Sequence, residues 1–583
     1  MNTVETDRKH FLSELERLTY PELIARFRFA VDEIQTLTNV SVDAGAVGSE
    51  FIQQAIDRHY WQQEMIGALI EERNRAQAVK CSLEPKSKDD KGETIIAPAA
   101  IMEAYQRTEI GDAELLQQLF IEKIVYDHSE KQWYIWNDKY WEKDGLDSIV
   151  LRVANQVASQ YYFLLAKKKR EGLPDDSPLS KGLYQRATAL RYKSRIKNVL
   201  TLAQSMPGLG ILGDEWDHHP MLLGVKNGVL DLTTGEMNGS KPTDYVRTVS
   251  TCEWKGIDEP CPRFEKFLLE IFDSNIELIA FIQRLLGYAI TGHTSEHIFV
   301  VFWGEGRNGK DTLLETLSGV LGEALATPVQ PQVLLADNKN DNSATPHLAA
   351  MRSRRLCWVN ETNDGAMLNV GQVKYLTGGG TVVARPLYGV PVTFTPQYLL
   401  VLMTNHCPKI NADDYAIWQR VLLVPFTQAF VDKPVQANEH KRDPKLKEIL
   451  RSEISGVLAW LVRGCLEWQK NGLQIPDIVR AATDQYRDGE DLVGRFVEEE
   501  CALIPDAKIK ADEFYNAYVH WAKKNHADES NKTAFGKKVT RRFKKDKLAS
   551  GIHYFGVKLC SSSPQNSEPI QDTGLAFLEN VDE

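Results

Sequence analysis

Apolar residues recur along this 583-residue chain with different periods in different stretches, and each period predicts a kind of element. Near the start they recur at helical spacing, for example at Phe11, Leu12, Leu15 and Leu18. We therefore expect helices over residues 1–81. The next stretch, 82–98, is polar and charged and has prolines near both ends, which predicts a linker.

Strand and helix patterns alternate in the region that follows. The aromatic alternation of Glu130–Gly145 is typical of a β-hairpin that turns at its Asn-Asp pair. Turn signals at Asn227-Gly228 and Thr234-Gly235 predict two short strands. Cys261–Gly292 has the apolar spacing of two amphipathic helices. An α+β domain is therefore expected before residue 293.

The most informative pattern runs from His297 to Leu321. The β-branched and aromatic residues Ile298–Trp303 predict a strand, a glycine-rich turn follows, and apolar residues at helical spacing come next. This order is the context of a phosphate-binding loop, because the glycines let backbone N–H groups approach an anion and the helix N-terminus faces it. The spacing Gly304-x-x-x-x-Gly309-Lys310 argues against a merely structural turn.

The same loop predicts which residues bind a nucleotide. Lys310 would reach the β- and γ-phosphates. The usual pattern has Ser or Thr next, as a Mg²⁺ ligand, whereas this chain has Asp311, with Thr312 one place later. A carboxylate also ligates hard cations, so both stay candidate metal ligands. The expected nucleotide contacts are Gly304, Glu305, Gly306, Arg307, Asn308, Gly309, Lys310, Asp311 and Thr312.

Four later segments each place a functional side chain beside a predicted strand. A glutamate that ends a strand could polarise an attacking water and join the metal ligands. We expect these side chains to converge with Lys310 at one edge of a sheet, where ligands bind in open α/β sheets. The segments are Arg354–Glu361, ending in Glu361; Val373–Pro396, a hairpin with Arg385 and Tyr388 near its tip; Gln397–Asn405, ending in Asn405; and Asp413–Phe426, with Arg420 before a strand.

Composition narrows the class of protein. The chain is too long for one core, and its 43% hydrophobic and 26% charged residues are those of globular domains. With a net charge of −11, any DNA contact must come from local patches or an inner channel. No apolar run predicts a membrane span. Eight scattered cysteines favour reduced thiols in a bacterial host cytoplasm or its equivalent, with zinc at Cys252 and Cys261 as the weaker alternative.

Taken together, the motifs resemble the phage/plasmid primase-helicase family of superfamily 3 helicases, the lineage of the poxvirus primase-helicase. The resemblance implies a multidomain α/β protein with an AAA+ P-loop core and a parallel sheet. It also implies ATP and Mg²⁺ as cofactors, hexameric rings and a DNA strand through the channel. The matching words are VKNGVLDLTTGEM, CPRFEKF, LLGYAITGHTSE, GEGRNGKDT, NET, LTGGG, ARPLYG, FTPQYLLVLMTNHCPKI and DDYAIWQRVLLVPF.

The resemblance also implies roles for single residues. Lys310 and its loop match the Walker A motif, and Glu361 matches the Walker B carboxylate. Asn405 matches the sensor residue that positions water, and Arg420 the arginine finger that completes a neighbour's site. The DNA-gripping hairpin of the family falls on Lys374, Arg385 and Tyr388.

The C-terminal region predicts a second DNA contact. Helices are expected over Leu446–Leu473. From Asp491 to Leu559 the pattern is three helices and a strand pair within GIHYFGVKL, which predicts a winged helix. KKVTRRFKKDK, Lys537–Lys547, is expected to place seven basic residues on one helix, with a solvated face as the alternative to DNA contact. The candidates are Lys537, Lys538, Arg541, Arg542, Lys544 and Lys545.

These inferences predict an ATP-dependent, ring-forming DNA helicase in phage, prophage or plasmid replication, acting on single-stranded or forked DNA with replication proteins. Priming is not expected, because no D-x-D pair occurs for metal-dependent nucleotidyl transfer. Asp311, Gly380 and Gly389 leave open a nucleotide-controlled DNA-binding initiator or switch, and phage defence also stays open. The predicted domains are 1–81, helical; 82–98, linker; 99–292, α+β; 293–475, AAA+ core; 476–560, winged-helix-like; and 561–583, a loose tail.

Overall fold

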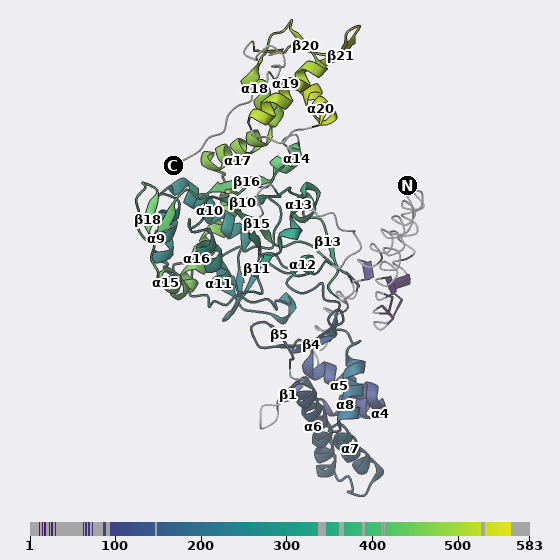
Figure 1. Cartoon of the computed structure of the whole chain (residues 1–583). Helices are drawn as coiled ribbons and strands as arrows, with labels where there is room; N and C mark the ends of the chain where they lie inside the picture. Colours follow the sequence, from purple (N-terminus) through teal and green to yellow (C-terminus); the bar gives the residue numbers. More distant parts are fainter. Residues whose placement is uncertain are drawn as a thin grey trace, which may run out of the picture.

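A five-stranded parallel sheet lies at the centre of the chain, and its strands include the apolar segments around the glycine-rich loop (Figure 1). Every neighbouring pair is parallel, and the register aligns Phe299 with Val421 and Val300 with Val401. Such strands are apolar on both sides because helices cover both faces of the sheet. In spatial order they are β11 (Ala326–Val329), β12 (Leu356–Asn360), β15 (Leu399–Thr404), β10 (Phe299–Trp303) and β16 (Val421–Pro425).

The computed structural model describes residues 94–560 apart from 146–147, 336–344, 361–365, 388–390, 411, 413 and 526–530. It also describes the backbone of 86–88 and scattered positions between residues 11 and 73. The prediction of helices over 1–81 therefore rests on those positions, among which Leu15, Leu23 and Ile66 are buried together. The predicted tail, 561–583, lies outside the described residues.

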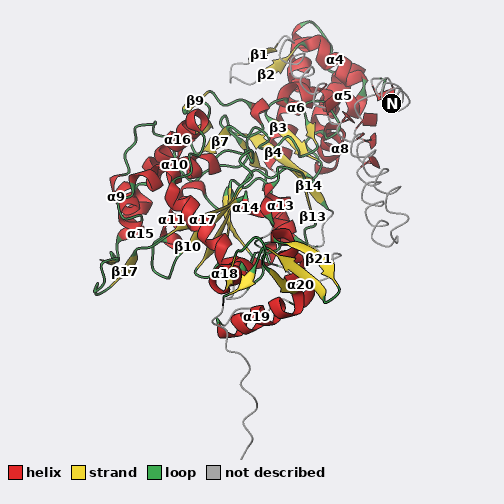
Figure 2. Ribbon diagram, turned by 90° about the horizontal axis from the view of Figure 1, so that it is seen from above, coloured by secondary structure: helices red, strands yellow, loops and turns green. Residues whose placement is uncertain are grey.

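Two helical layers enclose the sheet, and the alternation along β10 divides its side chains between them. Val300 and Phe302 lie in one core and Phe299 and Val301 in the other. The first layer comprises α9 (Pro262–Ile271), α10 (Ile276–Ala289), α11 (Lys310–Leu321), α15 (Leu446–Ser452) and α16 (Ile454–Asn471). The second comprises α12 (Pro346–Ala349), α13 (Val370–Thr377), α14 (Tyr415–Trp418) and α17 (Asp477–Glu490) (Figure 2).

The backbones of α10 and α16 touch where these helices cross. A Cβ on Gly287 would lie 2.1 Å from the N of Cys465, and one on Gly464 would lie 2.0 Å from the O of Gln283, so only glycine fits at both positions. Through this crossing α9 and α10 share one hydrophobic core with the sheet. The domain boundary expected at residue 292 is therefore wrong, because it would divide that core.

A helical unit with its own small sheet precedes the core. The buried carboxylate of Asp112 ties its helices together by accepting from Tyr161 Oη (2.6 Å), Arg186 Nη1 (3.1 Å) and Arg195 Nη2 (2.7 Å). The predicted hairpin is confirmed, with Trp136 opposite Trp141. The helices are α4 (Pro98–Gln106), α5 (Thr108–Phe120), α6 (Ser148–Arg170), α7 (Pro178–Ala189) and α8 (Lys193–Ala203), and the sheet is β5 (Trp141–Lys143), β4 (Gln132–Trp136), β3 (Ile124–Asp127) and β6 (Gly210–Ile211).

The stretch 82–98 is not simply a linker. β1 (Lys86–Lys88) pairs with β2 (Thr94–Ile96), and Ile95 and Ile96 are buried. Gln160 of α6 accepts from the N of Ile96 at 2.9 Å and donates to the O of Thr94 at 3.0 Å. The predicted linker is corrected in its second half, because two apolar side chains and a buried amide attach it to α6.

The connection between β6 and the core is held by side chains of the core. Arg352 Nη2 donates to the O of Gly213 at 3.0 Å, and Gln397 Nε2 donates to the O of Asp217 at 3.0 Å. The carboxylate of Glu215 accepts from the N of Gly213 at 2.9 Å. Beyond this connection lies a three-stranded meander, β7 (Leu222–Val225), β8 (Gly228–Asp231) and β9 (Glu236–Asn238), with one strand more than predicted.

The C-terminal unit packs around an aromatic core that includes Phe496, Phe514, Tyr518 and Phe535. It begins at α18 rather than at residue 476, because α17 places Tyr486 in the core of the central sheet. Its elements are α18 (Leu492–Glu500), α19 (Ala511–Lys524), α20 (Lys532–Arg542), the sheet β20 (Lys508–Lys510), β22 (Gly551–Phe555) and β21 (Lys544–Leu548), and the pair β19 (Cys501–Ala502) and β23 (Lys558–Leu559).

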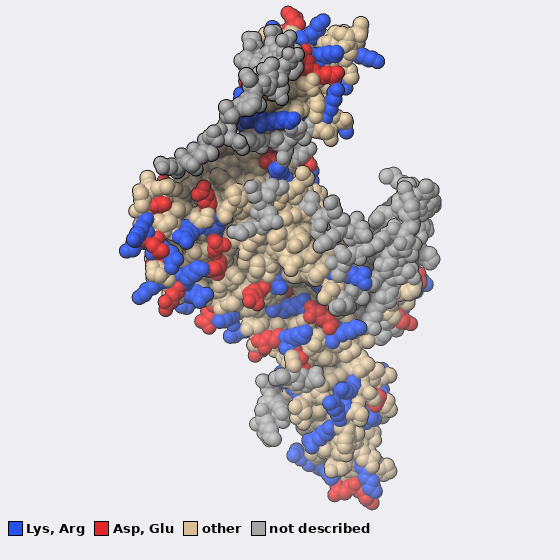
Figure 3. Space-filling model, in the orientation of Figure 1, with Lys and Arg blue, Asp and Glu red and all other residues tan. Residues whose placement is uncertain are grey.

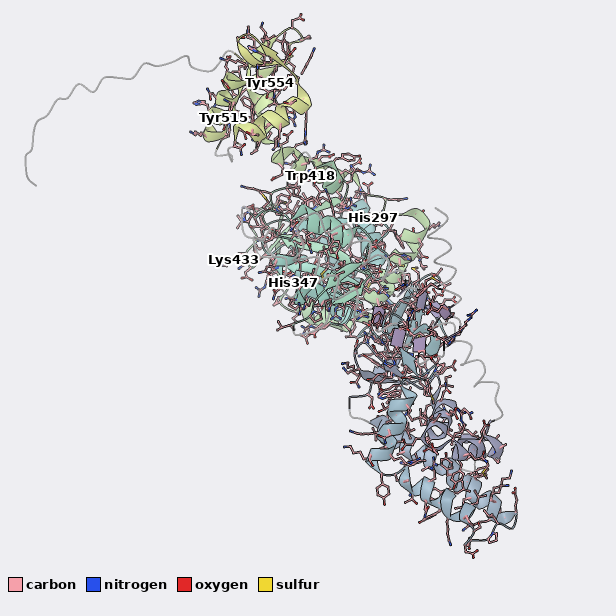
Figure 4. The ribbon with its side chains drawn as sticks, turned by 90° about the vertical axis from the view of Figure 1, so that its right-hand side faces the viewer. His297, His347, Trp418, Lys433, Tyr515 and Tyr554 are labelled. Carbon is pink, nitrogen blue, oxygen red and sulfur yellow. The ribbon has the colours of Figure 1, made fainter. Side chains whose placement is uncertain are left out.

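The predicted strand pair within GIHYFGVKL is wrong. β22 pairs with β20 and β21, whereas β23 pairs with β19. Gly556, at φ +87°, separates the two strands and sends the chain away from the sheet. The helical unit and the C-terminal unit extend from opposite ends of the central unit, with Trp418 near the end that faces Tyr515 and Tyr554 (Figure 4). Among the helices described, none has the length and apolar character needed to cross a membrane.

Candidate functional site

Packing determines the shape of the glycine-rich loop between β10 and α11. Gly309 has φ +93°, and a Cβ there would lie 2.5 Å from Cγ2 of Ile271. A Cβ on Gly304 would lie 2.2 Å from the O of Phe426. The buried side chain of Asn308 donates to that same O at 3.3 Å. The loop therefore lies tightly against α9 and the end of β16, and only its outer residues, Glu305 to Arg307, are exposed.

Lys310 begins α11, and its buried ammonium points back over the loop. Its Nζ donates to the O of Gly304 at 2.5 Å and to Oδ1 of Asn405 at 3.2 Å. Asn405 directly follows β15, the hydrogen-bonded neighbour of β10, so the sheet brings these two predicted residues together. These acceptors are neutral oxygens, and a phosphate would be a stronger partner for the ammonium.

The metal candidates lie at the start of the same helix. Asp311 is exposed and Thr312 half-buried in the first turn of α11, whereas Glu361 lies outside the described residues. A carboxylate and a hydroxyl are hard oxygen donors that suit Mg²⁺. The part of the chain that the structure describes has no group of three or more His, Cys, Asp or Glu placed to hold an ion.

Arg420 lies at the amino-terminal ends of the strands, whereas Lys310 lies at their carboxyl ends. This corrects the expectation that all the predicted site residues converge at one side of the sheet. Arg420 precedes β16, which runs parallel to β10, and its O accepts from the N of Phe299 at the start of β10. Lys310 comes after the far end of β10, roughly 15 Å away at the rise of a five-residue strand. Arg420 Nη1 donates to the O of Ala416 at 2.9 Å, and its Nε is buried with no partner among the described residues.

The predicted hairpin is present, with β13 (Val382–Ala384) antiparallel to β14 (Val392–Phe394). Arg385 is exposed just after β13, and its N donates to Oγ1 of Thr345 at 2.9 Å. Tyr388 lies outside the described residues. Lys374 is on α13 rather than on a strand of the hairpin, although α13 packs against β13, whose Val383 N donates to Oη of Tyr375 at 2.8 Å.

The ammonium of Lys374 forms an ion pair that the sequence did not reveal. Its Nζ donates to both carboxylate oxygens of Asp414, at 2.7 and 2.8 Å. Asp414 caps α14 and lies forty residues further along the chain, so no local pattern indicates the contact. A role for Lys374 at DNA would therefore require this pair to open.

The basic segment Lys537–Lys547 is divided between two elements, so the prediction of one basic helix is wrong. Helix α20 ends at Arg542 and β21 begins at Lys544, because the intervening Phe543 packs against the aromatic core. Arg542 forms an ion pair with Asp491, the N-cap of α18. Lys537, Lys538 and Arg541 lie on the helix, and Lys544 and Lys545 are exposed on the strand; Figure 3 shows Lys and Arg side chains on the visible face of this unit.

Comparison with known proteins adds two kinds of similarity. A family model described as D5 N terminal like matches residues 113–273, from α5 to just beyond α9. "Putative helicase L207/L206" of Acanthamoeba polyphaga mimivirus is 26% identical over 69% of this chain and 43% of its own length. "Putative helicase 022R" of Frog virus 3 is 27% identical over 47% of this chain and 29% of its own length. The chain thus spans less than half the length of these relatives.

A solved structure, the apo structure of the NrS-1 C terminal region, is also similar. Its TM-score is 0.41 with 12% sequence identity, over 77% of this chain and 99% of that one. This likeness is too distant to bear on the site.

Proposed function

Because this chain belongs to the phage and viral primase-helicase family, we propose that it is an ATP-dependent, ring-forming DNA helicase acting in phage, prophage or plasmid replication. The observation that carries the proposal is the contact of the Lys310 ammonium with the glycine loop and with Asn405, at the carboxyl ends of parallel strands. That edge is where open α/β sheets bind ligands. This arrangement suits a nucleoside triphosphate, whose phosphates the loop and the Lys310 ammonium would hold.

Each site residue then has a role in hydrolysis. When bound, ATP with Mg²⁺ supplies the phosphoryl group whose transfer to water powers movement. Lys310 would neutralise phosphate charge, Asn405 would orient the water, and Glu361 would accept its proton. Asp311 or Thr312 would complete the metal ligands.

Arg420 supports a ring rather than a solitary subunit. It lies across the sheet from Lys310 of its own chain, and its Nε has no partner among the residues described. A head-to-tail interface would bring it to the site of the next subunit, as an arginine finger requires. Hexameric closure is the ring size we propose from the family resemblance.

The proposal also assigns the DNA contacts. The hairpin with Arg385 and Tyr388 would grip one strand. The C-terminal unit, with three helices and an antiparallel sheet, would be a winged helix that meets DNA through Lys537, Lys538, Arg541, Lys544 and Lys545. Polar contacts of this kind attach to phosphates and position the protein without selecting a sequence.

ATP hydrolysis by wild type and by Lys310→Ala, with and without single-stranded DNA, tests the proposal. We expect DNA-stimulated turnover in a particle of about six chains, reduced about a hundredfold or more by Lys310→Ala, as loss of a charge-stabilising donor implies. Lys433→Ala, which removes an exposed lysine elsewhere in the central unit (Figure 4), should leave turnover unchanged.

The opposite outcome has a specific meaning. Nucleotide binding without any turnover in the wild-type protein would overturn the helicase proposal. Asp311, where Ser or Thr is usual, would then favour the DNA-binding initiator or switch instead. Strand separation on a forked substrate would exclude that alternative.

A further inference from the structure

Helices α6 to α8 form a basic segment in an acidic protein. Residues 148–203 contain eleven Lys and Arg but three Asp and Glu, whereas the whole chain has 69 and 80. All three acidic residues lie at the connection from α6 to α7, where Glu171 and Asp175 pair with Lys168 and Lys169. In Figure 3, Lys and Arg spread over the visible face of this lower unit and Asp and Glu gather at its tip.

Most of this positive charge is not used to stabilise the unit. Arg186 and Arg195 are held by the buried Asp112, and Lys168 and Lys169 by the acidic connection. The other seven Lys and Arg are exposed, and no ion pair is found for them within the part of the chain that is described. Such a concentration of unneutralised charge repels itself, so folding alone does not account for it.

Tyrosines lie among these cations on the surface. Tyr184 of α7 is 57% exposed and Tyr192, which precedes α8, is 65% exposed. The ring of Tyr184 meets that of Tyr162 of α6 edge to face, at 6.1 Å between centroids. The guanidinium of Arg191 lies 5.2 Å from the centroid of Tyr162.

The spacing along α7 aligns these side chains. Lys181 and Tyr184 are three residues apart and Thr188 follows four later, so all three share one face of the helix. The Oγ1 of Thr188 lies 3.4 Å from Oη of Tyr162, which keeps α6 beside this face. From Lys181 to Arg191 the row is roughly 15 Å long at the helical rise. We call Tyr162, Lys181, Tyr184, Arg191 and Tyr192 the basic–tyrosine face.

Tyr184 and Tyr192 take no part in the core of the unit, whereas Tyr162 packs against it. The apolar contacts of the core come from the opposite sides of the same helices, including Leu183, Ala187 and Ile196. A half-exposed aromatic ring beside unpaired cations is what sequence-tolerant binding of single strands requires, because each base offers a face for stacking and each phosphate a negative charge. Double-stranded DNA would satisfy the cations but has no free base faces for the rings.

We propose that the basic–tyrosine face is a binding site for single-stranded DNA, separate from the hairpin and from the C-terminal unit. Lys181 and Arg191 contact phosphates, and Tyr184 and Tyr192 stack on bases. The inference rests on the proposed function for its choice of DNA as ligand. It adds a contact outside the nucleotide-binding core, at the end of the molecule opposite the C-terminal unit.

Photo-crosslinking of the full chain to a single-stranded oligonucleotide containing 5-bromodeoxyuridine tests the site directly. We expect crosslinked peptides to include Tyr184 or Tyr192. Fluorescence anisotropy with the same oligonucleotide, without ATP, should show an affinity reduced roughly fivefold or more in the double variant Tyr184→Ala, Tyr192→Ala, as loss of base stacking implies. The double variant Tyr184→Phe, Tyr192→Phe keeps the rings and should bind like wild type.

Charge variants and controls complete the test. Lys181→Glu with Arg191→Glu should lower the salt dependence of binding by about 0.7 for each phosphate that the variant no longer neutralises. Lys433→Glu, a reversal of an exposed charge in the central unit, and Leu151→Ala, which truncates an exposed apolar side chain of α6, should change neither affinity nor slope. Crosslinks confined to other regions, with unchanged affinity in the tyrosine variant, would overturn the inference.

The two proposals fail in different ways. A protein without ATP turnover that still crosslinks through Tyr184 or Tyr192 would contradict the helicase proposal alone. A protein with DNA-stimulated turnover whose tyrosine-to-alanine variant binds as tightly as wild type would contradict the basic–tyrosine face alone. The same binding measurements in Lys310→Ala separate the two directly, because they need no hydrolysis.

Discussion

At the scale of single residues, the glycine pattern of the sequence and the packing in the structure both require glycine at position 309. The sequence places Gly309 before Lys310, and the structure adds that Gly309 has φ +93° and touches Ile271 of α9. Any other residue at this position would have to adopt a backbone conformation that L-amino acids rarely adopt, and its Cβ would clash with the side chain of Ile271. The loop is therefore held in one shape before any phosphate arrives.

Gly309→Ala should lower the free energy of unfolding by about 1–3 kcal/mol, because the substitution adds backbone strain and a steric clash. The matched control is Gly306→Ala in the same loop, where φ is not positive and nothing lies within 4 Å of the new Cβ. It should change stability by less than about 0.5 kcal/mol. Thermal unfolding of the variants checks this, and equal midpoints for both would contradict the packing argument.

At the scale of elements, the connection from β6 to β7 joins the helical unit to the core and contains a half-buried titratable group. Burial raises the pKa of the Glu215 carboxyl to about 7, although the N–H groups of Leu212 and Gly213 that donate to it act in the opposite direction. Neighbouring Asp214 raises it further. The folded chain therefore favours the protonated form of Glu215.

This preference makes stability depend on pH. The contribution is fully present below the ordinary carboxyl pKa of 4.5 and is lost as pH rises toward 7, since the unfolded chain releases its proton first. The loss amounts to at most about 3 kcal/mol across that window. Glu215→Gln keeps the acceptor oxygen but does not ionise, so its stability should fall less between pH 5 and pH 7.5.

Denaturant midpoints at the two pH values measure the effect. Glu448→Gln, at an exposed position of α15, is the control and should keep the wild-type dependence. If Glu215→Gln and wild type lose stability in parallel, the Glu215 carboxyl is not the cause.

At the scale of the whole molecule, Lys310 and Arg420 lie at opposite ends of the strands of one sheet, so a complete site under our proposal needs two subunits. Lys310→Ala and Arg420→Ala should each lose turnover alone. Mixing the two proteins before ring assembly should restore part of it, because roughly a quarter of the interfaces in a cyclic ring then combine an intact lysine with an intact arginine. The measurement is ATP hydrolysis of the mixture against each variant by itself.

A mixture as inactive as its parts would show that Arg420 does not act across an interface. Lys310→Ala mixed with wild type is the control for subunit exchange. It should lower turnover in proportion to the mutant share, or more steeply if neighbouring sites are coupled. Mass in solution, measured on the same mixtures, shows whether rings have formed.

The sequence by itself determined the local elements of this protein, because periodicity and glycine spacing act over a few residues. The segment Ile298–Leu321 predicts β10, the loop and α11. The apolar segments before Asn405 and after Arg420 likewise predict β15 and β16. The family resemblance likewise rested on short sequence motifs. Neither required knowledge of which segments lie side by side.

Only the tertiary structure decided how those pieces meet. Strand order brought Asn405 to Lys310, and the parallel direction of β16 put Arg420 at the other end of the strands. The pairing of Lys374 with Asp414 joined residues that no local pattern connects. Phe543 divided the basic segment because the C-terminal core needed its ring. The basic–tyrosine face formed only when α6 and α7 packed side by side, since its members are scattered along the sequence and become a surface through that contact.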